Sequence, residues 1–382
     1  MTTPRTPLHT LHAAGQSIWL DFIDRSLLQG DTLAHRITGE ALTGMTSNPT
    51  IFEKALASGT AYDAQLKASA AGRSAWDLFE LVETDDVRVA CDAFRGVYDA
   101  SKQQDGFVSI EVSPGAADDA DATVEEAHRL WKTVDRPNVM IKVPGTAAGC
   151  VALERLIADG MNVNVTLLFA VQAYDRVIEA YLRGLEARAA AGKPLAHVAS
   201  VASFFVSRVD TAIDAKLDAM VKAGTLDAAR ADALKGKAAI ANAKRAYKLF
   251  QQRFAGARWA ALSAKGAQVQ RPLWASTSTK NPAYRDTIYV EALIGPHTVN
   301  TMPPNTLEAF KDHGVTARTV DADVDAAEAL LTELESLGIS LDAVTDTLLS
   351  EGLASFQKSF DTLVAGIEQK TAALGQAVAA SR

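Results

Sequence analysis

The chain alternates short apolar runs with longer segments of helical spacing, and this alternation constrains its fold more than any other feature. Eight apolar runs span residues 17–22, 41–47, 106–113, 138–143, 162–168, 197–203, 271–277 and 297–302. Most of them are continuously apolar, which is typical of parallel strands that are covered on both faces. Helical patterns are found at 75–100, 123–133, 147–158, 171–190, 206–264 and 305–313. Eight such strands predict closure into an α/β fold of the (β/α)8 or TIM-barrel type.

No linker rich in Pro, Ser or Gly divides the chain of 382 residues. We therefore expect one barrel domain over residues 17–382, preceded by an N-terminal extension of residues 1–16. The C-terminal segment shows no strand pattern, so additional helices should pack outside the barrel. A doubly wound open sheet could use the same elements, but the Gly-rich turn typical of that fold is missing after Asp21.

Composition and charge limit the classes of partner. The chain is 48% hydrophobic and 22% charged, and its net charge is -8. These values predict a soluble protein and argue against nucleic-acid and membrane surfaces, so an anionic ligand would need a local basic pocket. Two cysteines cannot form a disulfide framework, and the N-terminus lacks an apolar signal segment. We expect a cytoplasmic protein.

Single polar residues stand near the carboxyl ends of several predicted strands, in otherwise apolar sequence. In a parallel barrel these ends meet on one face, which holds the active site. The residues are Asp21, Asn48, Glu111, Lys142, Thr166, Ser203 and Ser276.

Lys142 is the most informative of these residues because it lies among Val139, Met140, Ile141 and Val143. Burial of an unpaired ammonium would lower its pKa, and a neutral lysine can attack a ketone. The alternative is a lysine that reaches solvent or pairs with a carboxylate.

Two carboxylates, Glu111 and Asp21, could move the protons that such a lysine requires. Each could instead serve as a helix cap or as a structural partner of Lys142. Thr166 and Asn48 could hold a water or a substrate hydroxyl, although Asn48 before a proline is also a helix-start signal.

Basic residues follow two of the late strands. Arg208 and Lys280, with Ser276 nearby, predict a phosphate site of the kind that barrel enzymes build from their last loops. Ordinary surface ion pairs are the alternative. The seven histidines show no metal-ligand spacing, and no phosphate-binding GxxxxGK[ST] motif is present, so no metal and no cofactor are expected.

Seven strings, taken in order, carry a family resemblance: LDFIDRS, TGMTSNPTIF, SIEVSP, MIKVPGT, NVTLLF, ASFFVSRVD and ASTSTKNPAY. Together they resemble the transaldolase family in its longer-chain subtype, which is a class I, Schiff-base aldolase barrel. The match extends from about Ser17 to the terminal helices.

The resemblance implies a role for each matching residue. Lys142 would form the Schiff base, Glu111 and Thr166 would activate the catalytic water, and Asp21 would be the second acid–base. Substrate-binding roles would fall to Asn48, Ser203, Phe205, Arg208, Ser276 and Lys280. Many transaldolases carry an arginine shortly after the position of Ser276, whereas this chain has Lys280.

The implied reaction transfers a dihydroxyacetone unit reversibly from sedoheptulose 7-phosphate to glyceraldehyde 3-phosphate in the non-oxidative pentose phosphate pathway. Sugar phosphates would be the partners, and no cofactor would be needed. The related fructose-6-phosphate aldolases release dihydroxyacetone, but they carry Gln and Tyr where this chain has Glu111 and Phe205. A barrel that binds sugar phosphates without catalysis is the non-enzymatic alternative. Monomer and homodimer both stay open, with the outer C-terminal helices as the candidate contact surface.

Overall fold

A computed structural model describes residues 6–380 and contains a closed barrel of eight parallel strands in the order β1 to β8. The strands are β1 (Gln16–Asp21), β2 (Gly44–Thr46), β3 (Val108–Glu111), β4 (Val139–Pro144), β5 (Val163–Leu168), β6 (Ser200–Phe205), β7 (Gln270–Ala275) and β8 (Thr298–Met302). β8 pairs with β1, which closes the ring. The barrel prediction is therefore confirmed, and the open doubly wound sheet is wrong.

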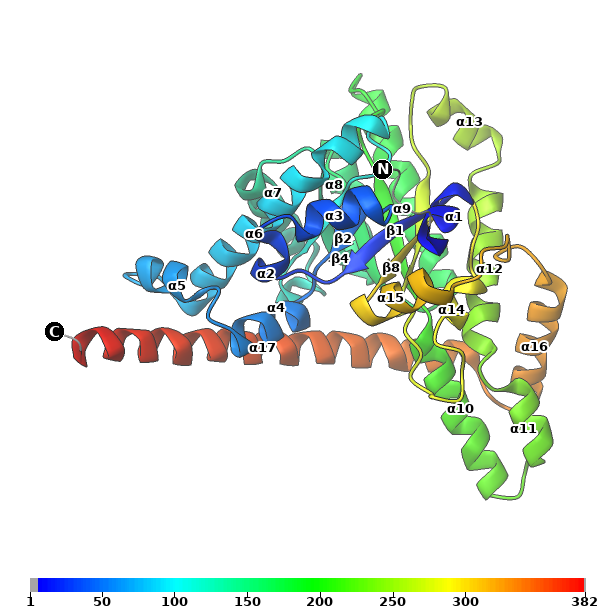
Figure 1. The fold of residues 1–382 in the computed structure, drawn as a ribbon. Helices are drawn as coiled ribbons and strands as arrows, with labels where there is room; N and C mark the ends of the chain where they lie inside the picture. The colour runs from blue at the N-terminus through cyan, green and yellow to red at the C-terminus, as the bar shows by residue number, and fades with distance from the viewer. Residues whose placement is uncertain (1–5, 381–382) are drawn as a thin grey trace.

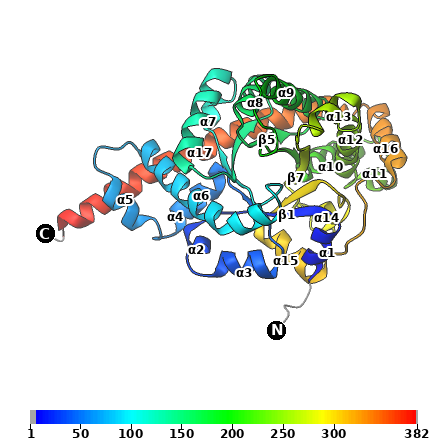
Figure 2. The ribbon, with the colours of Figure 1, turned by 90° about the horizontal axis from the view of Figure 1, so that it is seen from above.

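Helices surround the barrel on its outside (Figures 1 and 2). Those in the first half are α1 (Pro7–Ala13), α2 (Arg25–Leu28), α3 (Thr32–Gly39), α4 (Pro49–Ser58), α5 (Asp63–Ser69), α6 (Ala75–Ala100), the 3-10 turn η1 (Pro114–Ala116), α7 (Ala120–Val134), α8 (Ala147–Asp159) and α9 (Val171–Ala190). Those in the second half are α10 (Ser207–Lys222), α11 (Ala228–Leu234), α12 (Ala238–Arg253), α13 (Ala257–Ser263), α14 (Ile288–Glu291), α15 (Pro304–His313), α16 (Val324–Ser336) and α17 (Leu341–Ala380).

Strand bounds differ from the predicted ones where the backbone leaves the extended conformation. The run 41–47 contributes only the three residues of β2, and Ala41 at its start has a left-handed φ of 54°. Similarly, β7 ends at Ala275, since Ser276 has a φ of 56°. An apolar run in the sequence does not predict such turns, because a left-handed residue other than glycine has no strong sequence signal.

The N-terminal extension predicted at residues 1–16 lies partly outside the described residues, which begin at Thr6. Within the described part, α1 buries Leu8 and Leu11, and β1 already begins at Gln16.

The C-terminal segment forms α16 and the long helix α17, as expected for helices outside the barrel. α17 runs beneath the barrel in the view of Figure 1, and its C-terminal end extends beyond the body of the molecule. It contacts β5, η1, α4, α6 and α10. One helix therefore crosses the end of the barrel and touches elements from the first and the second half of the chain.

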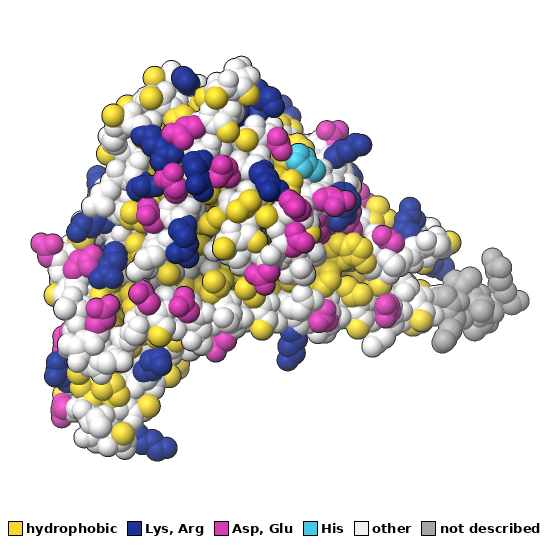
Figure 3. All heavy atoms as spheres, turned by 180° about the vertical axis from the view of Figure 1, so that it is seen from behind, with side chains coloured by type: hydrophobic (Ala, Val, Ile, Leu, Met, Phe, Trp, Pro, Cys, Tyr) yellow, Lys and Arg dark blue, Asp and Glu magenta, His cyan; other side chains and the backbone are white. Residues whose placement is uncertain are grey.

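Charged side chains of both signs are interspersed on the face shown in Figure 3. In the described part of the chain, no helix is long and apolar enough to be a membrane span.

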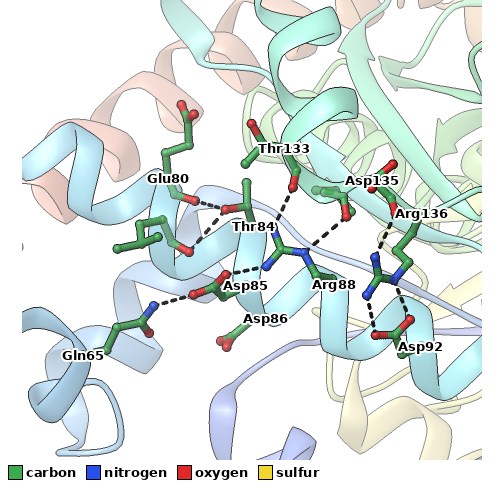
Figure 4. A network of polar contacts seen from close by, with 12 residues as sticks. Gln65, Glu80, Thr84, Asp85, Asp86, Arg88, Asp92, Thr133, Asp135 and Arg136 are labelled. Carbon is green, nitrogen blue, oxygen red and sulfur yellow. Dashed lines mark hydrogen bonds and ion pairs between the residues drawn. The ribbon is translucent and has the colours of Figure 1, made fainter. Parts of the chain in front are cut away.

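Arginines fix α6 against the segment that leads into β4 (Figure 4). Arg88 donates to the carbonyl oxygen of Thr133 at 2.6 Å, and Arg136 pairs with Asp92 at 2.6 Å. β4 begins three residues after Arg136 and carries Lys142. These contacts help to fix the position of β4 relative to α6.

We predict that Gly44→Ala destabilises the fold, because an added Cβ would lie 2.5 Å from the indole Nε1 of buried Trp19. The expected loss is about 1–3 kcal/mol in the free energy of unfolding, which is typical of overpacking. Denaturant unfolding measures it. Gly96→Ala is the matched control, because no atom lies within 4 Å of its added Cβ in helix α6. Equal stability of the two variants would contradict the prediction.

Candidate active site

A cavity of about 610 Å³ opens at the carboxyl ends of the strands and collects nine of the ten predicted site residues. They are Asp21, Asn48, Lys142, Thr166, Ser203, Phe205, Arg208, Ser276 and Lys280. The tenth, Glu111, is buried and accepts a hydrogen bond from Lys142. The structure therefore brings the whole predicted set to one end of the barrel, although the chain spreads it over more than half of its length.

Strand register brings Lys142 and Glu111 side by side. The two residues are paired neighbours on β4 and β3. The Nζ of Lys142 donates to Oε2 of Glu111 at 2.9 Å and to the carbonyl oxygen of Ser47 at 3.2 Å. Both side chains are buried. The lysine is therefore neither unpaired nor exposed to solvent: it pairs with a carboxylate inside the barrel, which is one of the alternatives that the sequence left open.

Burial controls the electrostatics of both carboxylates at the cavity. Removal from water raises the pKa of Glu111 above its ordinary value, and the nearby charge of Lys142 opposes this shift in part. The pKa of Asp21 is raised for the same reason, again opposed by Lys142 and by a hydrogen bond from Thr46. A raised pKa makes each carboxyl group a better proton acceptor, so both can exchange protons with groups at the cavity.

Thr46 fixes the orientation of Asp21. Its hydroxyl donates to Oδ1 of Asp21 at 2.7 Å and lies 2.7 Å from the hydroxyl of Thr301. Both threonines line the cavity, and sequence reasoning missed them. The threonines in these strands were a weak signal, because a buried strand threonine is common for packing reasons alone.

Thr166 presents a buried hydroxyl for which the structure shows no hydrogen-bond partner. It lies on β5, where the register with β6 shifts between Val165 and Leu168. Leu167 has a left-handed φ of 60° at this irregularity. A bulge of this kind redirects side chains locally. An unsatisfied hydroxyl at the edge of the cavity can bind a water or a substrate oxygen.

Asn48 and Ser203 both have structural partners. The Oδ1 atom of Asn48 accepts from the backbone N–H of Ile51 at 3.1 Å, which caps helix α4, so the helix-start interpretation is confirmed for that atom. Ser203 donates to Oδ1 of Asn164 at 2.7 Å. These bonds hold both side chains at the cavity wall.

Basic side chains lie near one another in another part of the cavity lining. Arg208 lies in the first turn of α10, with its guanidinium carbon 5.2 Å from the ring centroid of Phe205. Lys280 donates to the hydroxyl of Ser278 at 2.8 Å, and the hydroxyl of Ser276 lies 3.0 Å from that of Ser207. Burial lowers the pKa of Lys280, and the charges of Arg208 and Lys54 lower it further. Such neighbouring cations favour an anionic ligand.

Two further residues that line the cavity come from helices that sequence reasoning did not connect with the site. Lys54 lies on α4, and Phe356 lies on α17. No periodic pattern could have placed them there, because their positions depend on how α4 and α17 pack across the end of the barrel.

Among residues 6–380, no group of three or more His, Cys, Asp or Glu side chains is arranged to hold a metal ion. The two cysteines are both free, and Cys91 is buried.

Known proteins resemble this chain over nearly its full length. The family model described as Transaldolase/Fructose-6-phosphate aldolase matches residues 18–367. The chain is 49% identical to Transaldolase 2 of Nostoc sp. (strain PCC 7120) over 362 residues, which cover 93% of this chain and 95% of that protein.

Two further relatives show the same likeness. The chain is 48% identical to the transaldolase of Frankia alni, with 95% of this chain and 97% of the relative covered. It is also 48% identical to the transaldolase of Thermobifida fusca, with 96% and 99% covered. With a closed barrel, a buried lysine–glutamate pair at its mouth and this likeness over nearly the full length, the chain belongs to the transaldolase/fructose-6-phosphate aldolase family.

Proposed function

We propose that the chain is a transaldolase. It transfers a dihydroxyacetone unit reversibly from sedoheptulose 7-phosphate to glyceraldehyde 3-phosphate, which gives erythrose 4-phosphate and fructose 6-phosphate in the non-oxidative pentose phosphate pathway. The observation that carries this proposal is the buried Lys142 Nζ at 2.9 Å from Glu111, at a cavity that also contains Asp21 and the cations Arg208 and Lys280.

Lys142 begins the reaction as the nucleophile. Transfer of its proton to Glu111 leaves a neutral amine, and the raised pKa of Glu111 favours acceptance of that proton. The amine adds to the ketose carbonyl carbon, and loss of water gives a protonated Schiff base. Glu111 supports this loss by returning the proton, with a water held by Thr166, whose hydroxyl is otherwise unpartnered.

Asp21 acts at the carbon–carbon bond that breaks. Its carboxylate takes the proton from the hydroxyl beyond that bond, the bond electrons move into the iminium, and an aldose phosphate leaves. The three-carbon unit stays on Lys142 as an enamine. Thr46 keeps the Asp21 carboxyl oriented for this step. In the reverse direction Asp21 protonates the acceptor aldehyde oxygen as the new bond forms.

Side chains at both ends of the sugar phosphate hold the substrate in position. Asn48 and Ser203 hold the hydroxyls of the dihydroxyacetone moiety, and Arg208, Ser276 and Lys280 bind the phosphate. The mixed set of one guanidinium and one ammonium suits a dianion, with directional contacts from the arginine and a point charge from the lysine. The phosphate thereby orients the chain of the sugar toward Lys142.

Domain organisation, cofactor requirement, location and assembly complete the proposed function. Residues 17–382 act as one catalytic barrel domain after the N-terminal extension. The iminium of Lys142 is the electron sink, so the reaction requires no cofactor and no metal. A cytoplasmic location is supported by two free cysteines. A homodimer would use the outer C-terminal helices.

We predict that Lys142→Arg abolishes transfer from fructose 6-phosphate to an acceptor aldose phosphate, because an arginine cannot form the Schiff base. Arginine keeps the positive charge opposite Glu111, so the buried carboxylate retains a partner and the fold should persist. A coupled assay of the transferred product measures activity, and circular dichroism checks folding. Transfer activity at the level of the unmodified protein would refute the role of Lys142.

For the phosphate end, Arg208→Ala should raise KM for fructose 6-phosphate by about 10- to 100-fold, which corresponds to the loss of one charge-assisted hydrogen bond. Lys280→Ala should have a smaller effect, because Lys280 is more exposed. Initial-rate kinetics measures both. Lys67→Ala, on the exposed surface of α5, is the control. An unchanged KM in both cavity variants would place the phosphate elsewhere.

Phe205→Tyr should increase the release of free dihydroxyacetone relative to transfer. Phe205 lies at the cavity, and a hydroxyl there could hold a water close to the enamine. The ratio of free dihydroxyacetone to transferred product is the readout. An unchanged ratio in a folded variant would count against the role of Phe205 in transfer.

A further inference from the structure

Helix α17 carries an aromatic ring over the reactive lysine. The ring centroid of Phe356 lies 5.7 Å from Nζ of Lys142. Phe356 is only 8% exposed, and it lines the same cavity as Lys142 and Thr166. An aromatic ring at this distance attracts a cation and excludes water from the volume that it occupies.

Close approach of α17 to the barrel makes this contact possible. Gly352 lies one helical turn before Phe356, so both face the same side of α17. A Cβ at Gly352 would lie 3.0 Å from Cδ2 of Leu167, at the end of β5. The absence of a side chain at this position lets α17 rest directly on the strand end. Phe356 can then reach down to Lys142.

Contacts on the other side of Phe356 anchor the helix. Phe360, one turn further on, packs against Trp76 at 4.9 Å between ring centroids. Ser359 accepts a hydrogen bond from Thr50 at 2.8 Å, and Leu363 is buried. α17 therefore contacts α4 and α6 as well as the barrel strand β5.

We propose that Phe356 is a specificity-determining residue that keeps water away from the enamine and so favours transfer over release of dihydroxyacetone. This inference rests on the proposed role of Lys142. The ring covers the side of the Schiff base that faces α17, and the catalytic water stays with Glu111 and Thr166 on the barrel side.

The two fates of the enamine differ at one carbon. In transfer, that carbon forms a bond to the carbonyl carbon of the acceptor aldehyde, and the aldehyde oxygen gains a proton. In release, the same carbon takes a proton instead. Water then adds to the iminium carbon and the bond to Nζ breaks in either case, which returns the lysine amine and yields either the new ketose phosphate or dihydroxyacetone. A second water near the enamine carbon would supply the competing proton.

The test is the product ratio in the full chain with fructose 6-phosphate as donor. Phe356→Ala should raise the ratio of free dihydroxyacetone to transferred product at least about fivefold, consistent with opening one desolvated aromatic contact. Phe356→Leu, which restores an apolar cover, should return most of the lost transfer. Borohydride trapping should show the Schiff base in each variant.

Phe360→Ala is the matched control, because it loosens the same helix without removing a side chain from the cavity. It should lower thermal stability and raise the ratio less than Phe356→Ala does, because the Phe356 ring itself is retained. An unchanged ratio in folded Phe356→Ala, or an equal rise in Phe360→Ala, would overturn the inference. If the unmodified protein gave neither product nor trapped adduct, the proposed function itself would fail, and that outcome is distinct from a fault in the role of Phe356.

Discussion

The ion pair between Lys142 and Glu111 is the interaction on which the rest of the site depends. A buried ammonium is costly without a partner, and Glu111 supplies one at 2.9 Å on the neighbouring strand. The same pair gives the lysine a proton acceptor whose pKa is raised by burial. Structural stability and reactivity therefore have one origin: the pairing of Lys142 with Glu111 in the register between β4 and β3.

Closure of the barrel places further reactive side chains in the same cavity as the lysine of this pair. Closure between β8 and β1 brings Asp21 and Thr301 to the same end as Lys142, although they come from opposite ends of the barrel sequence. Two helices contribute further side chains. Arg208, in the first turn of α10, provides charge for an anion, whereas α17 provides an apolar wall through Phe356. Polar side chains from several strands thus line the cavity, and the ring of Phe356 on α17 lies over Lys142.

Most of the site could be predicted from the sequence, because a parallel barrel places polar residues at strand ends on one face. That rule locates Asp21, Glu111 and Lys142 from the amino-acid sequence alone. It cannot locate Phe356, since helical periodicity does not specify which strand ends a terminal helix crosses. Nor does it predict the left-handed turn at Ser276, which shortens β7 and places that residue after the strand. Tertiary packing and backbone turns determine these features.

Borohydride trapping identifies the side chain that forms the Schiff base. The protein is incubated with fructose 6-phosphate, reduced, digested and examined by peptide mass spectrometry. We expect a three-carbon adduct on Lys142, together with release of an aldose phosphate, because the enamine retains the dihydroxyacetone unit after the carbon–carbon bond breaks. An adduct on another lysine, or no adduct on any lysine of the folded protein, would contradict it and would favour a barrel that binds sugar phosphates without Schiff-base chemistry.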